Sequence, residues 1–385
     1  MPPIYDALSY DGEPPASAGW REGFPVGNRL FCDIGRFTTD SNFEFDNVRV
    51  AYQTWGELNE QGSNAIYIAH ALTGDSHVTG DSGSGHITGG WWNSLVGPGA
   101  PIDTNTYFVV CANVLGGCQG TTGPSSYAPD SKEWGARFPV ITIADMVRVE
   151  YELMKCLGID SFVLMLGPSL GGMRVLEWML RYPDAVRGGL VLGSTAAVSA
   201  DEIGIHATQI AAIELDPHFA NGDYYESPIG PVAGMGLARK IAHLSYRSES
   251  ELNMRFGRAV QGDLLPAEGG RFAIESYLDH HADKLGRRFD ANTYIALTRA
   301  MSLFDLGTGR GGVRVALGQI TAPLTVVGID SDRLFPLHLQ QEIVDSAPGA
   351  DYLHLLESPF GHDGFLVEEE QVARFVGHAL RRVTT

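Results

Sequence analysis

Apolar and polar positions alternate between two patterns along most of the chain. Short, nearly continuous apolar runs predict buried strands, and stretches with apolar residues every three or four positions predict helices. The expected strands cover residues 48–56, 64–72, 106–116, 161–167, 186–194, 322–330 and 350–358. The expected helices among them cover residues 141–159, 170–183, 338–347 and 368–381. This alternation predicts an α/β fold with a mostly parallel sheet and helices on both faces.

The alternation stops between residues 197 and 312. No strong strand pattern appears there, and helical spacing is found at residues 200–215, 236–247, 250–260, 272–289 and 291–306. A helical segment between two strands is typical of a lid over the carboxyl ends of the strands, where open α/β sheets place their sites. We therefore expect a core of residues 1–196 and 313–385 with a helical lid at 197–312. Residues 1 to about 45 are expected to form an irregular arm leading into a strand.

Composition narrows the choice of partners. The net charge is −19, so nucleic acid and anionic membrane surfaces are poor candidates, and the charge itself serves solubility. The four cysteines form no C-x-x-C pair. The first residues lack the apolar segment of a signal peptide, and no apolar run approaches the roughly 18 residues of a spanning helix. These features predict a cytoplasmic protein with reduced thiols.

A G-x-S-x-G pattern occurs at residues 167–171, directly after an apolar run and before a helical stretch. The bare pattern is weak, but this context is typical of a serine held on a sharp strand-to-helix turn. The turn needs Gly167, Gly171 and Gly172 because Cβ atoms would collide there. Ser169 is therefore a candidate nucleophile, and the alternative is an ordinary helix cap.

A serine nucleophile needs a base, and the base needs a carboxylate to orient it. In sheets of this kind the chain order is serine, acid, histidine. Asp330 and Asp332 follow a late expected strand, and His362 lies in a later loop flanked by glycines. The residues alone favour His362 as the base and leave both aspartates open. Structural roles are expected for the other late histidines, which lie in predicted helices or a strand: His338, His354 and His378.

Acyl transfer also needs donors for the oxyanion. The backbone N–H of Leu170 follows the nucleophile, and Leu72 lies in the loop after an earlier strand. His70, in the same loop, is interpreted as a residue that holds the turn in shape. We expect no metal and no bound cofactor, because the sequence offers neither a convincing set of metal ligands nor a nucleotide-binding glycine loop.

Many segments, from about residue 45 to the C-terminus, resemble the homoserine O-acyltransferases of the α/β-hydrolase fold. The motifs that carry the resemblance are HALTGDSHVTG, GWWNSLVGPGAPIDT, NVLGGCQGTTGPSS, WGARFPVITIADMV, SLGGMRVLEW, GLARKIAHLSYR, RFAIESYLDHHADKLGRRFDANTYI, SDRLFPLHLQQE and GHDGFL. So many motifs in the same order are highly specific.

The resemblance implies a ping-pong acetyltransferase of methionine biosynthesis. It would move an acetyl group from acetyl-CoA, its co-substrate, to the hydroxyl of L-homoserine through an acyl-serine. It also implies that Asp332, and not Asp330, is the acid of the triad. Arg239 and Tyr246 would hold the homoserine carboxylate and Asp363 its ammonium group. A homodimer formed through the lid helices is implied as well.

The chain departs from the family pattern at four positions. At the serine turn, Pro168 and Leu170 replace a glycine and a methionine, and the proline removes an N–H group. Ala197 and Thr308 stand where the family often has arginine. The loss of two positive charges would weaken binding of an anionic donor. These changes leave the acyl donor and the acceptor open.

Four functions therefore remain in competition. The first is homoserine O-acetyltransferase, and the second is an esterase in which water resolves the acyl-serine of a small ester. The third is an O-acyltransferase that uses succinyl-CoA or another hydroxyl acceptor. A non-enzymatic binding module is the weakest, because a complete triad would be surplus. Arg239 separates the first two, because only an amino-acid acceptor needs a partner for its carboxylate.

Overall fold

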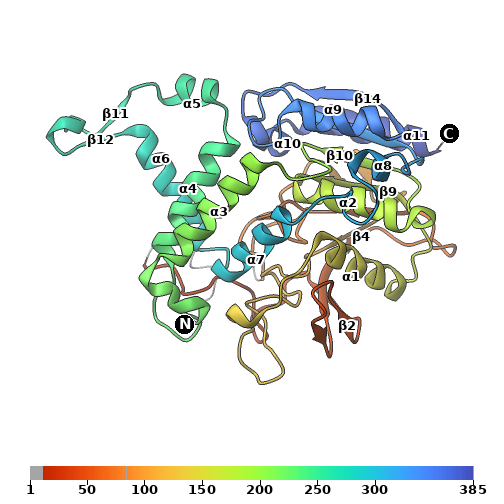
Figure 1. The fold of residues 1–385 in the computed structure, drawn as a ribbon, viewed down its shortest axis with the longest axis horizontal. Helices are drawn as coiled ribbons and strands as arrows, with labels where there is room; N and C mark the ends of the chain where they lie inside the picture. Colours follow the sequence, from red (N-terminus) through yellow and green to blue (C-terminus); the bar gives the residue numbers. More distant parts are fainter. Residues whose placement is uncertain (1–11, 84, 385) are drawn as a thin grey trace.

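The computed structural model describes residues 12–83 and 85–384, and its centre is an eight-stranded sheet (Figure 1). The strand order is β1-β4-β8-β5-β9-β10-β13-β14. β4 pairs antiparallel with β1 and β8, and the remaining pairs in the sheet are parallel. The strands are Leu30–Asp33 (β1), Arg49–Trp55 (β4), Ala65–Ile68 (β5), Phe108–Ala112 (β8), Phe162–Pro168 (β9), Gly189–Leu192 (β10), Leu324–Ile329 (β13) and Ala350–Leu356 (β14).

Helices pack on both faces of the sheet, because each carries one apolar stripe. On one face, α1, α2 and α9 contribute buried residues such as Trp178 to the larger core cluster. On the other face, α11 contributes Val372 and Val376, which are four positions apart and point the same way. These helices are Ile143–Cys156 (α1), Leu170–Arg181 (α2), Leu337–Ser346 (α9) and Glu369–Thr384 (α11). The prediction of a mostly parallel sheet covered on both faces is confirmed.

Five α-helices, interrupted by a short ladder, lie between β10 and α8, and Figure 1 shows them grouped to one side of the sheet. They are Ala200–Glu214 (α3), Val232–Tyr246 (α4), Glu249–Phe256 (α5), Ala273–Gly286 (α6) and Ala291–Ser302 (α7). The two ends of this inserted segment meet. The Val198 N–H donates to the Phe304 carbonyl at 3.0 Å, and the Leu306 N–H donates to the Ala196 carbonyl at 2.9 Å. The chain then returns to the core through α8 (Val313–Leu317).

The elements that sequence patterns did not reveal are short. The N-terminal arm contains β1, whose four residues pair with β4 at the edge of the sheet. Several ladders have only two residues per strand, including one inside the helical segment, so they carry no usable periodicity. They are Phe37–Thr38 (β2), Glu44–Phe45 (β3), Val96–Gly97 (β6), Ile102–Asp103 (β7), Val260–Gln261 (β11) and Arg271–Phe272 (β12). The remaining short turns of helix are Gly135–Arg137, Pro183–Ala185, Pro217–Gly222, Pro266–Glu268, Gly361–Asp363 and Gly364–Val367 (α10).

The expectation that all thiols are reduced is wrong for one pair. Cys32 on β1 and Cys156 at the end of α1 form a disulfide across 124 positions of sequence, whereas Cys111 and Cys118 are free and buried. The sequence could not reveal this pairing, because β1 itself was not predicted and the helix end packs beside it only in the folded chain. None of the helices in the described ranges is long and apolar enough to cross a membrane.

Candidate active site

Ser169 lies on a sharp turn between β9 and α2. Its φ of 55° and ψ of −123° place a non-glycine residue in a strained conformation, which persists only where the surroundings enforce it. A Cβ at Gly171 would lie 2.0 Å from the Ala69 carbonyl oxygen, and one at Gly167 would lie 2.6 Å from the Gly171 carbonyl carbon. Ser169 occupies the cap position of α2, yet its side chain makes no capping hydrogen bond. The hydroxyl is therefore left available for another use.

His362 is paired with one of the two candidate aspartates. Its Nδ1 lies 2.6 Å from Oδ2 of Asp332, and both side chains are almost fully buried. The other oxygen of Asp332 accepts hydrogen bonds from the N–H groups of Leu334 and Phe335, at 2.8 and 3.0 Å. Since Nδ1 faces the carboxylate, Nε2 of the ring is the nitrogen left for a proton transfer.

Asp330 has a different partner. Its carboxylate accepts the Ser358 N–H at 3.0 Å and so fastens the loop that leads to His362. The structure thus brings Asp332, and not Asp330, against the imidazole.

Two opposing influences act on the pKa of His362. Burial favours the neutral ring and lowers the pKa, whereas the charge of Asp332 and the hydrogen bond to it raise it. The net result is a pKa above the ordinary histidine value, because the acid stabilises the imidazolium. Charged His362 is therefore favoured over a wider pH range than in an isolated peptide.

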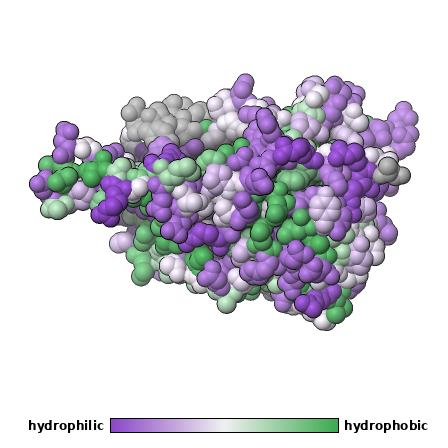
Figure 2. Space-filling model, turned by 90° about the horizontal axis from the view of Figure 1, so that it is seen from above, coloured by the Kyte–Doolittle hydropathy of each residue, from purple (hydrophilic) through white to green (hydrophobic). Residues whose placement is uncertain are grey.

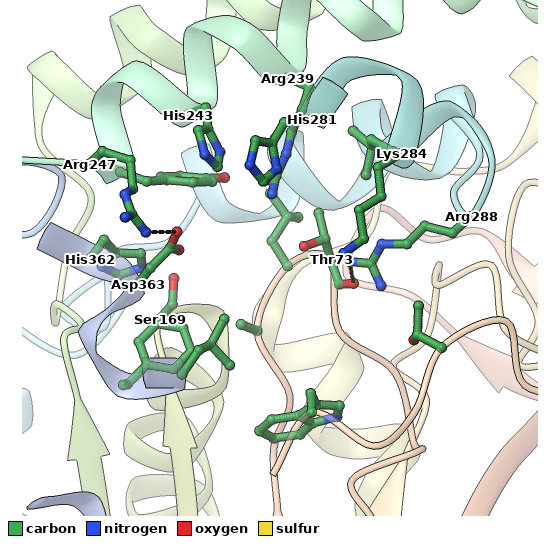
Figure 3. Close-up of a pocket in the computed structure, with 18 of the residues that line it drawn as sticks. Thr73, Ser169, Arg239, His243, Arg247, His281, Lys284, Arg288, His362 and Asp363 are labelled. Carbon is green, nitrogen blue, oxygen red and sulfur yellow. Dashed lines mark hydrogen bonds and ion pairs between the residues drawn. The ribbon is translucent and has the colours of Figure 1, made fainter. Parts of the chain in front are cut away.

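Ser169 and His362 face the same cavity, which has a volume of about 340 Å³. Figure 3 shows the Ser169 side chain pointing toward His362 and Asp363 from below, with the side chains of α4 and α6 above. Leu72 lines the cavity. Leu170 is the first residue of α2, so its N–H has no partner within the helix and lies at the positive end of the helix dipole.

Arg239 and Tyr246, on α4, also line this cavity. The Arg239 guanidinium lies over the Tyr246 ring, 5.6 Å from its centroid, and the Tyr246 ring centroid lies 5.8 Å from that of His362. Asp363 lines the cavity as well, and its carboxylate lies 3.5 Å from the guanidinium of Arg247. The predicted acceptor-binding residues are thus gathered around the serine.

Sequence reasoning missed a group of cations on α6 and just beyond it. Lys284 and Arg288 line the cavity together with Arg239. Burial, Arg288 and Arg239 all lower the pKa of Lys284. No ion pair to a carboxylate is found for these three cations in the part of the chain that the structure describes. Such a surplus of positive charge at a cavity wall favours an anionic ligand.

The spacing along the two helices could have revealed this wall. On α4, Arg239, His243 and Tyr246 follow at steps of four and three, which is one face of a helix. On α6 and its end, Tyr277, His281, Lys284 and Arg288 follow the same rule. His243 Nε2 lies 2.8 Å from the Tyr277 hydroxyl, which joins the two faces. Burial, followed by Arg239, lowers the pKa of His243 to about 2 and that of His281 to about 4, so both rings are neutral.

His70 holds the loop that carries Leu72, as the sequence suggested. Its Nε2 accepts the Val114 N–H at 3.0 Å, and its Nδ1 lies 2.8 Å from the Ala71 carbonyl. Burial and the neighbouring Arg174 lower the pKa of His70 to about 3, so the ring is neutral. The His70 carbonyl in turn accepts a hydrogen bond from Arg174 at 2.7 Å, which ties this loop to α2.

The positions that depart from the family pattern lie outside the cavity wall. Pro168 ends β9 beside Leu192, so its missing N–H lies at the end of a ladder. Ala197 and Thr308 lie at the two ends of the inserted helical segment, and Thr308 is exposed. The cations of the wall come instead from α4, from α6 and from Arg288 just beyond α6.

Comparison with known proteins agrees with this geometry. The alpha/beta hydrolase fold family matches residues 64–369. The chain is 53% identical over 377 residues to the homoserine O-acetyltransferase of Thermobifida fusca (strain YX), which covers 97% of this chain and 100% of that protein. The solved homoserine O-acetyltransferase from Bacillus anthracis has a TM-score of 0.84 at 27% identity, covering 91% of this chain and 97% of that one. Esterase E22 has a TM-score of 0.83 at 26% identity, covering 91% and 99%.

The sheet order, the strained serine turn and the late histidine define an α/β-hydrolase-fold protein. Similarity at 53% identity over nearly the whole chain is more specific than the fold. The chain belongs to the homoserine O-acetyltransferase family.

Proposed function

We propose that this protein transfers an acetyl group from acetyl-CoA to the hydroxyl of L-homoserine, a step of methionine biosynthesis. The observation that carries the proposal is the cavity that joins Ser169 and His362 to Arg239. A hydrolase of neutral esters needs the first two residues, and an amino-acid acceptor needs the third as well. The similarity to curated homoserine O-acetyltransferases supports the same substrates.

The first half-reaction uses Ser169, His362 and Asp332. Nε2 of His362 takes the hydroxyl proton while the serine oxygen attacks the acetyl carbonyl carbon of the thioester. The tetrahedral intermediate collapses, the carbon–sulfur bond breaks, and the imidazolium returns its proton to the departing thiolate of CoA. Asp332 orients the ring and stabilises its charged form, in keeping with the 2.6 Å contact. Backbone N–H groups of Leu72 and Leu170 receive the developing oxyanion.

The second half-reaction repeats these steps with homoserine. His362 removes the proton of the acceptor hydroxyl, that oxygen attacks the acetyl-serine, and Ser169 leaves with the proton. Arg239 binds the carboxylate of homoserine with its planar fork, and Tyr246 adds a hydroxyl donor. Asp363 pairs with the ammonium group, and the nearby Arg247 sets the position of that carboxylate.

The donor is anionic, and the cavity wall suits it. Within the described ranges, neither Lys284 nor Arg288 forms an ion pair with a carboxylate, although the charge of Asp75 acts on Arg288. We assign them to the phosphate groups of CoA, with the thioester directed toward Ser169. In this assignment, Lys284 and Arg288 supply positive charge in place of the two arginines that the family often has where this chain has Ala197 and Thr308.

Thiol release from acetyl-CoA, followed with and without L-homoserine, tests the proposal. We expect a burst of about one equivalent without homoserine, and sustained release with an equal amount of O-acetylhomoserine when it is present. Ser169→Ala should lose both. Ser194→Ala is a matched control. The Ser194 hydroxyl donates a hydrogen bond to the Ser169 carbonyl at 2.7 Å and has no part in the proposed reaction. Sustained release without homoserine would overturn the transferase assignment.

The second candidate is an esterase of the same fold. The TM-score with esterase E22, 0.83, is nearly the same as the 0.84 with the transferase from Bacillus anthracis, so the fold does not choose between them. Rapid hydrolysis of simple acetate esters, with no effect of homoserine, would favour the esterase.

The helical segment at residues 197–312 is proposed to act as a lid and as the contact of a homodimer. Several apolar side chains on it are exposed, and Figure 2 shows hydrophobic patches on its projecting end, at the left. The exposed apolar residues of this segment include Leu237, Leu244, Met254, Leu264 and Leu265. Sedimentation equilibrium of the protein and of Met254→Glu measures this: the dimer should dissociate in the variant, and a monomeric parent protein would contradict it.

We assign the reaction to the cytoplasm. The similarity to a homoserine O-acetyltransferase, a metabolic enzyme, supports this location, whereas the disulfide between Cys32 and Cys156 opposes it, because such bonds are rare in cytosolic proteins.

A further inference from the structure

Three side chains that can bind a metal converge between β14 and α11. Nε2 of His354 lies 3.3 Å from both carboxylate oxygens of Asp351, and Nε2 of His378 lies 2.6 Å from one of them. The three ligand atoms all lie within 4.8 Å of one another. Two imidazoles and one carboxylate form a donor set typical of zinc and related transition metals.

A β-bulge brings the two strand residues to the same side. Positions three apart in a regular strand point to opposite faces of the sheet. Here Leu324 pairs with Ala350 and Val326 pairs with Leu353, so two steps on β13 match three on β14. The extra residue turns Asp351 and His354 toward α11, where His378 meets them. A regular strand would separate these ligands, and bulges are common where a side chain must be aimed.

The spacing of these atoms suits a tetrahedral ion. Zinc bonds of about 2.0–2.1 Å separate neighbouring ligand atoms by about 3.3 Å. The separation of His354 from Asp351 already has this value, and His378 needs to withdraw from Asp351 by less than about 1 Å. The two histidine nitrogens lie within 4.8 Å of each other and need to approach to about 3.3 Å. The side chains of Asp351, His354 and His378 are 19%, 7% and 28% exposed, so solvent reaches the cluster and can supply a fourth ligand.

One cation competes at this cluster. Arg382 lies 3.5 Å from Oδ1 of Asp351, but its guanidinium also donates to the carbonyls of Leu324 and Gly349, at 2.6 and 2.8 Å. These bonds hold the guanidinium on the backbone and leave Oδ2 of Asp351 to the histidines. The positive charge of Arg382 weakens the binding of a metal ion, but its guanidinium does not fill the position of the ion.

We propose that Asp351, His354 and His378 form a zinc-binding site that joins the edge strand β14 to the C-terminal helix α11. Asp351 lies near the beginning of β14, whereas Asp332 and Ser169 follow the carboxyl ends of β13 and β9. Because these strands run parallel, the cluster lies toward their amino-terminal ends, whereas the catalytic cavity lies at their carboxyl ends. A bound ion would therefore stabilise the fold and take no part in acyl transfer.

Isothermal titration of zinc chloride into the full chain, freed of any histidine tag and stripped with a chelator, tests the site. We expect one equivalent to bind, with an accompanying rise in Tm. His378→Gln and Asp351→Asn should each weaken binding by roughly tenfold or more, since even outer contacts of metal ligands have effects of that size. His338→Gln is the matched control, because this histidine is exposed on α9 and lies outside the cluster.

The variants decide between the possible outcomes. Binding that is lost in His378→Gln and Asp351→Asn and retained in His338→Gln supports the proposal. Equal affinity in all variants would place zinc elsewhere and overturn it, as would the absence of binding to the parent chain at millimolar zinc. Circular dichroism of each variant separates loss of binding from loss of folding, and His378 is the more informative position because its side chain is 28% exposed.

Discussion

Asp332 and Asp330 are two residues apart, yet only Asp332 touches the imidazole of His362, at 2.6 Å, while Asp330 accepts the Ser358 N–H. Asp332→Asn should therefore reduce acetyl transfer by roughly 10⁴-fold, the size found when a triad acid is replaced by its amide. Asp330→Asn is the control and should stay within a few-fold of the parent. Equal losses in both variants would contradict the assignment of Asp332.

The same contact predicts the pH dependence. His362 acts as a base only when neutral, and its pKa is raised above the ordinary value of about 6.5 because Asp332, together with the charges of Asp363 and Glu202, outweighs the opposing effect of burial. The burst rate with acetyl-CoA should rise with pH through this raised pKa and then level off. In Asp332→Asn burial and the weaker influence of Asp363 and Glu202 remain while the charge of Asp332 is gone, so the residual rate should level off at lower pH. A rate that is flat between about pH 5 and 8 would count against His362 as the base.

Arg239 should separate acceptor binding from acyl-enzyme chemistry. Arg239→Ala removes the partner of the homoserine carboxylate, and a charge-assisted contact contributes about 1.5–3 kcal/mol. We expect the KM for homoserine to rise by roughly 10- to 100-fold, while hydrolysis of a small neutral acetate ester is spared. Lys240→Ala is the neighbouring control, since Lys240 pairs with Asp279 at the surface. A parallel loss of ester hydrolysis would show that Arg239 does something other than bind the acceptor.

Lys284 should affect only those acyl donors that carry phosphate groups. Lys284→Gln is expected to raise the KM for acetyl-CoA by roughly tenfold, as loss of a single charge-assisted contact predicts. The KM for S-acetyl-N-acetylcysteamine, a neutral thioester without phosphates, should not change. Lys155→Gln, on the exposed side of α1, controls for the loss of a positive charge. An equal effect on both donors would contradict phosphate binding.

The disulfide gives a prediction that is independent of catalysis. Protein unfolded without reductant should show the two free thiols of Cys111 and Cys118, and four after reduction. Cys32→Ser should lower the free energy of unfolding by about 2–4 kcal/mol, because the bond closes a long loop of the unfolded chain. Cys118→Ser serves as the control for loss of a buried thiol. A count of four thiols in protein alkylated directly in the cell and unfolded without reductant would contradict the disulfide between Cys32 and Cys156.

Sequence patterns predicted the long parallel strands and the helices of the inserted segment to within a few residues. This success is physical, because a buried strand such as β9 and an amphipathic helix such as α11 each impose a period on the sequence. Edge strand β1 and the two-residue ladders impose none. Their positions depend on partners that are distant in the chain.

The candidate site divides in the same way. Ser169 is visible in the sequence because the turn admits only small neighbours, and His362 because of its place in the chain order. Lys284 and Arg288 gave only a weaker signal, a helix face shared with Tyr277 and His281, and such a face looks the same whether it borders solvent or a cavity. The choice between Asp330 and Asp332 came from family resemblance, and the contact with His362 now gives it a geometric basis.

The inserted helices leave and re-enter the core at one place, where the backbones around Ala196–Val198 and Phe304–Leu306 are hydrogen-bonded to each other. The two connections between the inserted segment and the core therefore lie side by side. Arg239, Tyr246, Lys284 and Arg288 all lie beyond these connections, whereas Ser169, Asp332 and His362 lie on the core side. The inserted segment can therefore be exchanged as a unit. A chimera that grafts the corresponding helices of an esterase onto this core would change which molecule accepts the acetyl group, while the nucleophile stays in place.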